Sequence, residues 1–239
     1  MLTKTKAIVL RTVKYGDRRL IIDTFTRDSG TVSFAATVPK TARGRLKRQY
    51  FQPLTLLDLE CDIRPSATLH RIRDVRLAWP YTTLPFDPGK LSVALFLAEF
   101  LVGALRGEQR NEALFDYICD SLMWLDSCEA HFANFHIVFM ARLTRFLGFY
   151  PNLDGYRPGC CFDLRAACFS PLTPLHRDVL HGRDAEAVGT VMRMDFATMR
   201  LFRMSRAERN RLADIILSYY RLHLPSFPEL RSLDVLRAL

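Results

Sequence analysis

The spacing of apolar residues changes once along this chain, from a period of two in the first 80 residues to helical spacing beyond about residue 90. Alternation is typical of strands that bury one face, and a spacing of three or four is typical of helices. The alternating runs cover residues 6–13, 20–26, 31–38, 57–61 and 69–77. Five short strands with glycine turns and no helical pattern between them predict a small antiparallel barrel or sandwich.

A proline-rich stretch separates the two patterns. Pro80, Pro85 and Pro88 lie between Trp79 and Gly89, which is typical of a domain junction. The helical patterns beyond it cover residues 90–106, 111–126, 130–148, 172–181, 184–204, 206–223 and 229–239, and residues 149–170 are irregular. We therefore predict an α+β chain, with a β domain over residues 1–80 and a helical domain over residues 81–239.

Basic residues are concentrated at the start of the chain. The first 50 positions contain twelve Lys or Arg and three Asp, which accounts for the whole formal net charge of +9, because the remaining basic and acidic residues balance. A local excess of this kind predicts a surface that faces a polyanion such as nucleic acid. The alternative is a solvated basic face that has no partner.

The densest basic segment connects the third and fourth expected strands. It runs from Lys40 to Arg48 and carries five basic residues and no acidic one. A loop at the rim of a barrel can place such charges at successive phosphates. The basic side chains that we expect to contact nucleic acid are Lys14, Arg18, Arg19, Lys40, Arg43, Arg45, Lys47 and Arg48.

The aromatic residues divide into two groups. Tyr15, Tyr50 and Phe51 lie closest in sequence to basic residues, so they are candidates for stacking on bases. Phe25 and Phe34 alternate with polar residues, which predicts that both fill the interior of the barrel.

Signatures of catalysis and of membrane insertion are missing. The common phosphate-binding, nucleophile-elbow and zinc-protease motifs do not occur, and the six histidines are scattered. The longest apolar run, Leu91 to Leu105, contains Glu99 and is shorter than the roughly 20 residues that span a bilayer. We therefore expect a protein that is not an enzyme, with no catalytic residues and no cofactor. The spacing of the six cysteines does not suggest a disulfide framework, so we expect a cytoplasmic location.

Six short motifs follow one another along the full length of the chain. They are Tyr15-Gly16-Asp17, Phe25-Thr26, Gly30, Gln52-Pro53, Leu147-Gly148-Phe149 and Leu230-Arg231-Ser232. In these motifs and their order, the chain resembles the RecO family of bacterial recombination mediators and DNA-annealing proteins. The resemblance implies a five-stranded OB-fold barrel followed by a helical domain.

Membership of that family would imply a role in DNA repair and a set of partners. It implies binding of single- and double-stranded DNA, strand annealing, and partnership with RecR. It also implies contact with the acidic tail of single-stranded-DNA-binding protein, so that RecA is loaded indirectly, and a location at the nucleoid. For that tail we expect a site at Arg142 and Arg145, which lie on leucine-containing helical turns, because an acidic peptide with an aromatic end needs an apolar pocket with a cation at its rim.

The sequence departs from the resemblance at a zinc module. Many RecO proteins carry two C-x-x-C pairs after the Leu-Gly-Phe motif, whereas residues 149–170 here contain only Cys160, Cys161 and Cys168. Adjacent cysteines rarely bind one tetrahedral ion. We expect a hairpin that keeps the shape of the module without metal, in which the thiols pack as small apolar groups.

Two other functions fit the same residues. The chain could be a different OB-fold protein that binds single strands of RNA or DNA, since the sequence barely separates the two. It could also be an interaction scaffold whose basic face meets an acidic protein.

Overall fold

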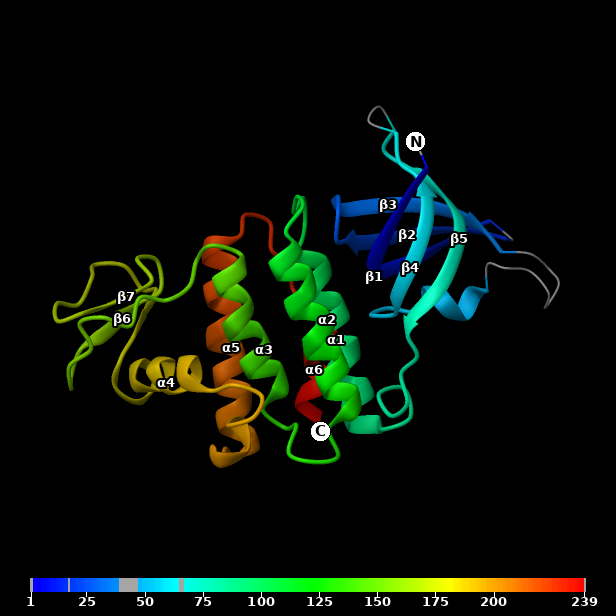
Figure 1. Ribbon diagram of the computed structural model, residues 1–239. Coiled ribbons are helices and arrows are strands. Elements are labelled where there is room, and N and C mark those ends of the chain that lie inside the picture. Colours follow the sequence, from blue (N-terminus) through cyan, green and yellow to red (C-terminus); the bar gives the residue numbers. More distant parts are fainter. Residues whose placement is uncertain (1, 17, 39–46, 65–66, 239) are drawn as a thin grey trace. The chain divides into compact units, whose positions relative to one another are not determined.

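The computed structural model describes residues 2–16, 18–38, 47–64 and 67–238. The chain forms two compact units (Figure 1). The first comprises the residues up to Ser127 together with Leu230–Arg237, and the second comprises Cys128–Glu229. No helix within the described ranges is long and apolar enough to cross a membrane. The division at residue 80 that the sequence suggests stays a prediction.

Five strands in the first unit close into a barrel with the order β1-β2-β3-β5-β4. The strands are β1 (Leu2–Tyr15), β2 (Arg19–Thr26), β3 (Gly30–Thr37), β4 (Leu56–Asp62) and β5 (His70–Trp79). All neighbours are antiparallel except β3 and β5, which pair in parallel and close the barrel. The predicted five-stranded OB-fold barrel is therefore confirmed.

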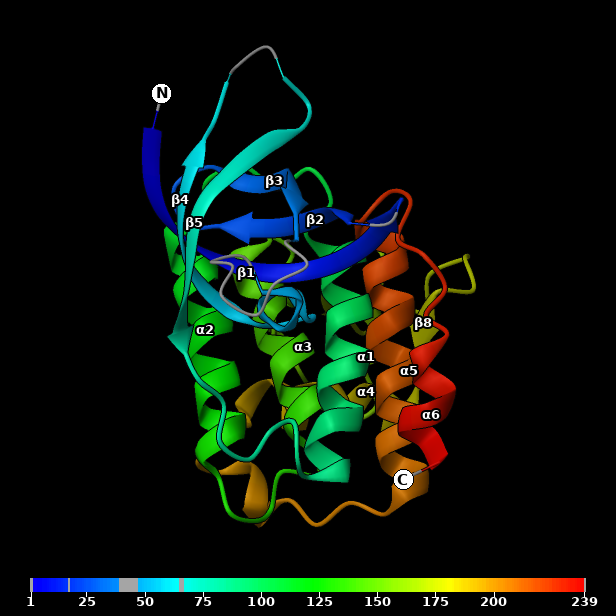
Figure 2. The same cartoon turned by 90° about the vertical axis from the view of Figure 1, so that its right-hand side faces the viewer.

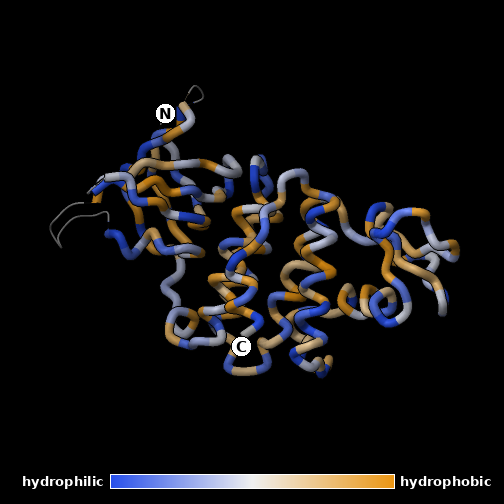
Figure 3. The backbone as a smooth tube through the Cα atoms, turned by 180° about the vertical axis from the view of Figure 1, so that it is seen from behind, coloured by the Kyte–Doolittle hydropathy of each residue, from blue (hydrophilic) through white to orange (hydrophobic). Residues whose placement is uncertain are grey.

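Alternate residues of the strands fill the barrel. Val9, Ile22, Phe34 and Leu59 belong to one buried cluster, and each has an exposed fraction of 2% or less. Figure 3 shows the same alternation as orange and blue segments along the strands near the N-terminus. β1 is buried on both faces over Ala7–Leu10, since α1 (Pro88–Ala104) packs against this strand.

Phe25 does not fill the barrel, contrary to the prediction from its alternation. It is fully buried, but it lies outside the barrel cluster and its ring centroid is 6.0 Å from that of Phe115 in α2 (Glu112–Ser127). Ile22 points into the barrel, and a residue three positions along a strand points to the opposite face. The prediction for Phe34 is confirmed. β2 has large apolar residues on both faces, with Ile21 and Phe25 on the outer one, whereas those of β3 lie on the inner face.

The helices of the first unit lie on the β1 side of the barrel (Figure 2). α1 begins at Pro88, and the side chain of Asp87 caps it by accepting a hydrogen bond from the backbone N–H of Lys90 at 3.0 Å. α6 (Ser232–Ala238) joins this unit through Glu99 of α1, whose carboxylate accepts a hydrogen bond from the backbone N–H of Ser232 at 2.8 Å. The C-terminal helix is therefore attached through a side chain of α1.

The proline-rich stretch after Trp79 is tightly bound to the end of α2. The buried carboxylate of Asp126 accepts hydrogen bonds from the backbone N–H groups of Thr82, Thr83 and Leu84 at 2.8–3.1 Å. The buried ammonium of Lys90 donates to the Thr83 hydroxyl at 2.6 Å and to the Asp126 carbonyl at 3.0 Å. This polar cluster connects the last strand of the barrel to the helices.

The second unit contains three helices and a small sheet with the order β7-β6-β8. Its elements are α3 (Phe135–Phe146), β6 (Cys161–Asp163), β7 (Cys168–Ser170), β8 (Val179–Leu180), α4 (Gly182–Arg193), the 3-10 turn η2 (Met199–Leu201) and α5 (Arg206–His223). The predicted helical region with a small irregular hairpin is confirmed.

Two helix predictions for this unit are wrong, one in kind and one in extent. Residues 172–181 form a loop and β8, because Leu172 and Leu175 are exposed and Leu180 instead pairs with Phe162 of β6. The helix expected over 184–204 ends at Arg193, and the backbone continues in extended form at Met194.

A glycine is required where the β2–β3 turn meets the connection between α1 and α2. Gly30 has a φ of +68°, and an added Cβ would lie 2.3 Å from the carbonyl oxygen of Glu108. We expect Gly30→Ala to lower the free energy of unfolding by about 2–4 kcal/mol, measured by urea denaturation. Gly16→Ala is the matched control, since Gly16 has a φ of +75° and open space around it, so only the backbone cost of about 1 kcal/mol applies. Equal losses in both variants would show that the contact with Glu108 is unimportant.

Candidate nucleic-acid interface

Four strands of the barrel share an outer row of small and apolar side chains. Val13 of β1 lies opposite Ile21 of β2, Ile21 lies opposite Ala35 of β3, and Ala35 lies opposite Arg71 of β5. Opposed residues point to the same face of a sheet. This row faces outward because Ile22, the neighbour of Ile21, fills the core. The result is an apolar strip that ends in an arginine.

A second row lies beside the first, toward the end of the barrel. Tyr15 of β1 lies opposite Arg19 of β2, which lies opposite Thr37 of β3. The side chain of Tyr15 is 64% exposed, so its ring is available to a ligand. An exposed aromatic ring next to an arginine is the pair of groups that stacks on a base and contacts its phosphate.

The residues of these rows, apart from Val13, line a groove with a volume of about 950 Å³. Its lining comes from β1, β2, β3, the end of β4 and the start of β5. In OB folds the face over strands 2 and 3, with the β1–β2 and β4–β5 loops, is the usual ligand-binding surface. The charged residues that line the groove are Arg19, Arg64, Arg71, Arg73 and Asp62.

The acidic residue in the groove is engaged by one of the arginines. Asp62 accepts a hydrogen bond from Nε of Arg73 at 2.6 Å, and this bond lowers the pKa of the carboxyl group. No ion pair forms with Arg19, Arg64 or Arg71 within the part of the chain that the structure describes. Three guanidinium groups are therefore available to an anionic ligand.

The predicted contact residues of the barrel are dispersed. Tyr15 and Arg19 line the groove, whereas Lys14 and Arg18 are exposed near the same turn without lining it. Lys40, Arg43 and Arg45 lie outside the described residues. Their part in binding stays a prediction.

The remaining candidates lie around the short 3-10 helix η1 (Arg48–Phe51). Lys47 and Arg48 are exposed, and the ammonium of Lys47 lies 6.0 Å from the centroid of the Tyr50 ring. Tyr50 is half-buried against the barrel core. The prediction that Phe51 stacks on bases is wrong, because Phe51 is 2% exposed and belongs to the core.

Three arginines of the groove lie outside the set expected from the sequence. Arg71 and Arg73 lie near the start of β5, on either side of the core residue Ile72. The alternation of β5 is the signal that places them on the outer face. Arg64 is positioned by its backbone N–H, which donates to Nδ1 of His70 at 3.3 Å.

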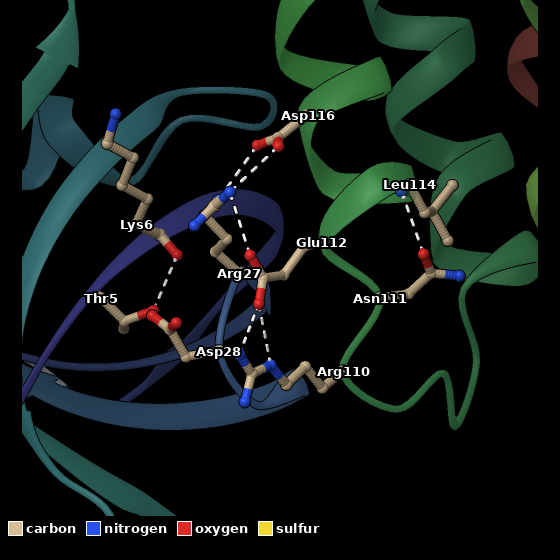
Figure 4. Close-up of polar contacts among 9 residues, drawn as sticks. All are labelled: Thr5, Lys6, Arg27, Asp28, Arg110, Asn111, Glu112, Leu114 and Asp116. Carbon is tan, nitrogen blue, oxygen red and sulfur yellow. Dashed lines mark hydrogen bonds and ion pairs between the residues drawn. The ribbon is translucent and has the colours of Figure 1, made fainter.

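Some basic residues of the first 50 are neutralised. Figure 4 shows Arg27, in the turn after β2, directed at α2. Its guanidinium contacts the carboxylates of Asp116 at 3.1 Å and Glu112 at 3.0 Å. These groups lie beside a second hollow of about 590 Å³, whose lining mixes acidic and basic side chains. Its charges nearly cancel, so it is a poor surface for a polyanion.

Arg142 and Arg145 differ in their surroundings in the second unit. Arg142 is half-buried, and its Nε donates to the carbonyl of Met194 at 2.8 Å. Arg145 is exposed, 6.0 Å from the centroid of the Tyr150 ring. A narrow apolar cavity of about 40 Å³ lies among α3, α4, α5 and β6, and neither arginine lines it. Their role in partner binding stays a prediction.

The cysteines of the small sheet point to different sides. Cys160 packs with Phe162 and Tyr219 in a buried cluster, whereas the Cys161 thiol lies 3.3 Å from the carbonyl of Ser170. Cys160 immediately precedes β6, and the two adjacent thiols have different neighbours, so they are not directed at one point. No group of three or more potential metal ligands occurs among the residues that the structure describes. The absence of zinc from the purified protein stays a prediction.

Comparison with known proteins assigns both parts of the chain to one family. The family model described as recombination protein O N terminal matches residues 1–81, and the model described as recombination protein O C terminal matches residues 85–234. The chain belongs to the RecO family. The fold agrees with this assignment, because the RecO N-terminal region here is the closed barrel.

Relatives over the full length carry the name DNA repair protein RecO. The protein of Phocaeicola vulgatus is 49% identical over 239 residues, which covers all of this chain and 99% of the relative. The protein of Bacteroides fragilis is 48% identical over 240 residues, and that of Flavobacterium psychrophilum is 31% identical over 238 residues, with similar coverage. The RecO assignment thus holds for the whole chain.

Proposed function

We propose that this RecO protein is a DNA-binding recombination mediator that holds a single strand in the groove of its barrel. The observation that carries the proposal is the groove itself, in which an exposed tyrosine and an apolar row are flanked by three arginines that have no ion pair among the described residues. Single-strand binders combine a basic groove with stacking side chains in this way.

The side chains of the groove contribute to binding in two ways, through phosphate contacts and through stacking. Arg19, Arg64 and Arg71 contact phosphates, and each contact releases condensed counterions, so affinity falls with salt. Tyr15 stacks on a base. Phosphate contacts and stacking read little sequence, so the protein binds strands of many sequences with similar affinity.

The wider role follows the family. The protein also binds double-stranded DNA, anneals complementary strands and, with RecR, helps to load RecA onto DNA coated by single-stranded-DNA-binding protein. The acidic tail of single-stranded-DNA-binding protein would bind the helical unit at Arg145, which is exposed, and at Arg142 on the same helix. Binding and strand positioning require no covalent chemistry, so the protein acts without a cofactor or catalytic residues. It acts in the cytoplasm, at the nucleoid.

The stacking group gives a direct test. We expect Tyr15→Ala to weaken binding of a single-stranded DNA oligonucleotide about tenfold, because stacking of one base contributes roughly 1–3 kcal/mol. Tyr15→Phe keeps the ring and is expected to bind like the wild type. Fluorescence anisotropy at fixed salt measures both. Equal affinity for the Ala and Phe variants would remove stacking from the proposal.

Two alternatives are separated by ligand comparison. An RNA-binding protein or a scaffold for an acidic partner would use the same charges. Single-stranded DNA, RNA of the same sequence and heparin should be titrated at matched salt. Tighter binding of DNA than of the other two supports the proposal, and equal binding of heparin favours the scaffold.

A further inference from the structure

The connection between α4 and α5 carries arginines that the proposed groove does not use. Arg193 ends α4, Arg200 lies in η2, and Arg203 precedes α5. All three side chains are exposed. We refer to these three residues as the arginine strip.

The backbone of the strip is held in place. The side-chain amide of Asn134, just before α3, donates to the carbonyls of Met199 at 3.3 Å and Phe202 at 2.8 Å. Met194 and Met199 are buried, and the ring of Phe196 stacks on that of Phe135 with centroids 4.8 Å apart. The backbone that carries the arginines is therefore ordered before a ligand binds, so less conformational entropy is lost on binding.

The acidic residues of the segment are used for local structure. Asp195 accepts hydrogen bonds from the hydroxyl of Thr198 at 2.7 Å and from its backbone N–H, and these bonds lower the pKa of Asp195. Glu208 forms the capping box of α5 with Ser205. Neither Arg200 nor Arg203 forms an ion pair across the described ranges of the chain. The strip therefore keeps a positive field toward solvent.

We propose that the arginine strip binds the phosphates of a second nucleic-acid strand while the groove of the barrel holds the first. Two polyanions repel each other, and a protein that brings them together must neutralise charge on both. This inference rests on the proposed function, since it requires a first strand in the groove.

The chemistry of the strip favours a nucleic acid over an acidic peptide. Guanidinium groups match phosphate oxygens in a bidentate geometry. Leu201, 68% exposed between Arg200 and Arg203, offers an apolar contact to a base. A peptide with an aromatic end needs an apolar pocket, and the apolar cavity of this unit is lined by other residues.

The test uses the full-length protein and two variants of equal charge change. R200Q/R203Q removes two charges from the strip, and R157Q/R177Q removes two exposed charges elsewhere in the same unit. The protein is first saturated with one labelled single-stranded oligonucleotide. Capture of a second, non-complementary oligonucleotide is then titrated, and the annealing rate of complementary strands is measured separately.

We expect R200Q/R203Q to bind the first strand within about twofold of wild type. It should capture the second strand about tenfold more weakly and anneal more slowly by a similar factor, because two phosphate contacts are lost. R157Q/R177Q should behave like the wild type in all three measurements.

Four outcomes would overturn the inference. The first three are wild-type capture of the second strand by R200Q/R203Q, an equal loss in R157Q/R177Q, and a loss of first-strand affinity in R200Q/R203Q. Loss of binding to an acidic peptide with normal second-strand capture would likewise assign the strip to a protein. The groove proposal is tested separately, by measuring the affinity of groove variants for the first strand.

Discussion

Replacing Arg19, Arg64 and Arg71 together by Gln is expected to weaken single-stranded DNA binding by about a hundredfold at physiological salt. Each charge-assisted contact contributes about 1 kcal/mol or more, and three of them give about 3 kcal/mol. The plot of log K against log salt should become shallower by about two, since each phosphate contact on a single strand contributes roughly 0.7. Anisotropy titrations at several salt concentrations measure both quantities.

The control variant loses the same number of positive charges at positions outside the groove. Lys4, Arg76 and Arg106 are exposed and do not line the groove, so their replacement by Gln removes three charges from the same unit. We expect less than a twofold change in affinity. If the two triple variants lose affinity equally, the effect is one of net charge and the groove is not the binding site.

The basic connector can be compared in the same titrations. Replacement of Arg43, Arg45, Lys47 and Arg48 by Ala tests whether phosphates also contact the connector from Lys40 to Arg48. A salt dependence that changes only in the groove variant would place the strand on β1, β2, β3 and β5. A change in both variants would extend the contact surface to the connector.

Removal of the Asp126 carboxylate is expected to produce the largest loss of stability. Asp126→Ala leaves the backbone N–H groups of Thr82, Thr83 and Leu84 without their acceptor and removes a negative charge close to the buried Lys90. We expect a decrease of about 3–5 kcal/mol in the free energy of unfolding. Asp120→Asn, an exposed carboxylate on the same helix, should change it by less than about 0.5 kcal/mol. Chemical denaturation measures both, and a small loss in Asp126→Ala would contradict the anchoring role.

The same carboxylate should make stability depend on pH. Burial raises the pKa of Asp126, but hydrogen bonds from the N–H groups of Leu84, Thr83 and Thr82 outweigh it and lower the pKa from 3.8 to about 2. A lowered folded-state pKa stabilises the fold above the unfolded value, and this stabilisation is lost as pH falls from about 4 to 2. The loss amounts to about 2–2.5 kcal/mol. In Asp126→Asn this part of the acid dependence should be absent.

Local periodicity was sufficient for the elements of the barrel. The alternation around Phe34 placed that ring inside, and the five expected strands correspond to the observed ones to within a few residues at most ends. Alternation works here because a strand with one apolar face has only one way to bury it. The helices α2 and α5 are predictable for the corresponding reason, since their buried residues recur with helical spacing, whereas α1 is a long apolar run that is buried on almost all sides.

Contacts between distant segments decided what periodicity could not. β2 has large apolar residues on both faces, so only the position of Phe115 shows that Phe25 faces a helix. Residues 172–181 have helical spacing but no helix, because β8 gains a partner in β6. Such choices depend on a neighbour from elsewhere in the chain, which a local pattern does not contain.

The candidate interface shows the same division. The sequence alone shows that positive charge gathers near the N-terminus, and it predicts Tyr15 and Arg19 as contact residues. The pairing of Arg71 with Ala35 is visible only in the tertiary structure. It arises because β3 and β5, which β4 separates in sequence, pair in parallel and close the barrel. It also showed that Arg27 is neutralised by Asp116 and Glu112 of a helix about 90 residues away along the chain. Charge is a property of the sequence, but whether a charge faces solvent or a carboxylate is decided by packing.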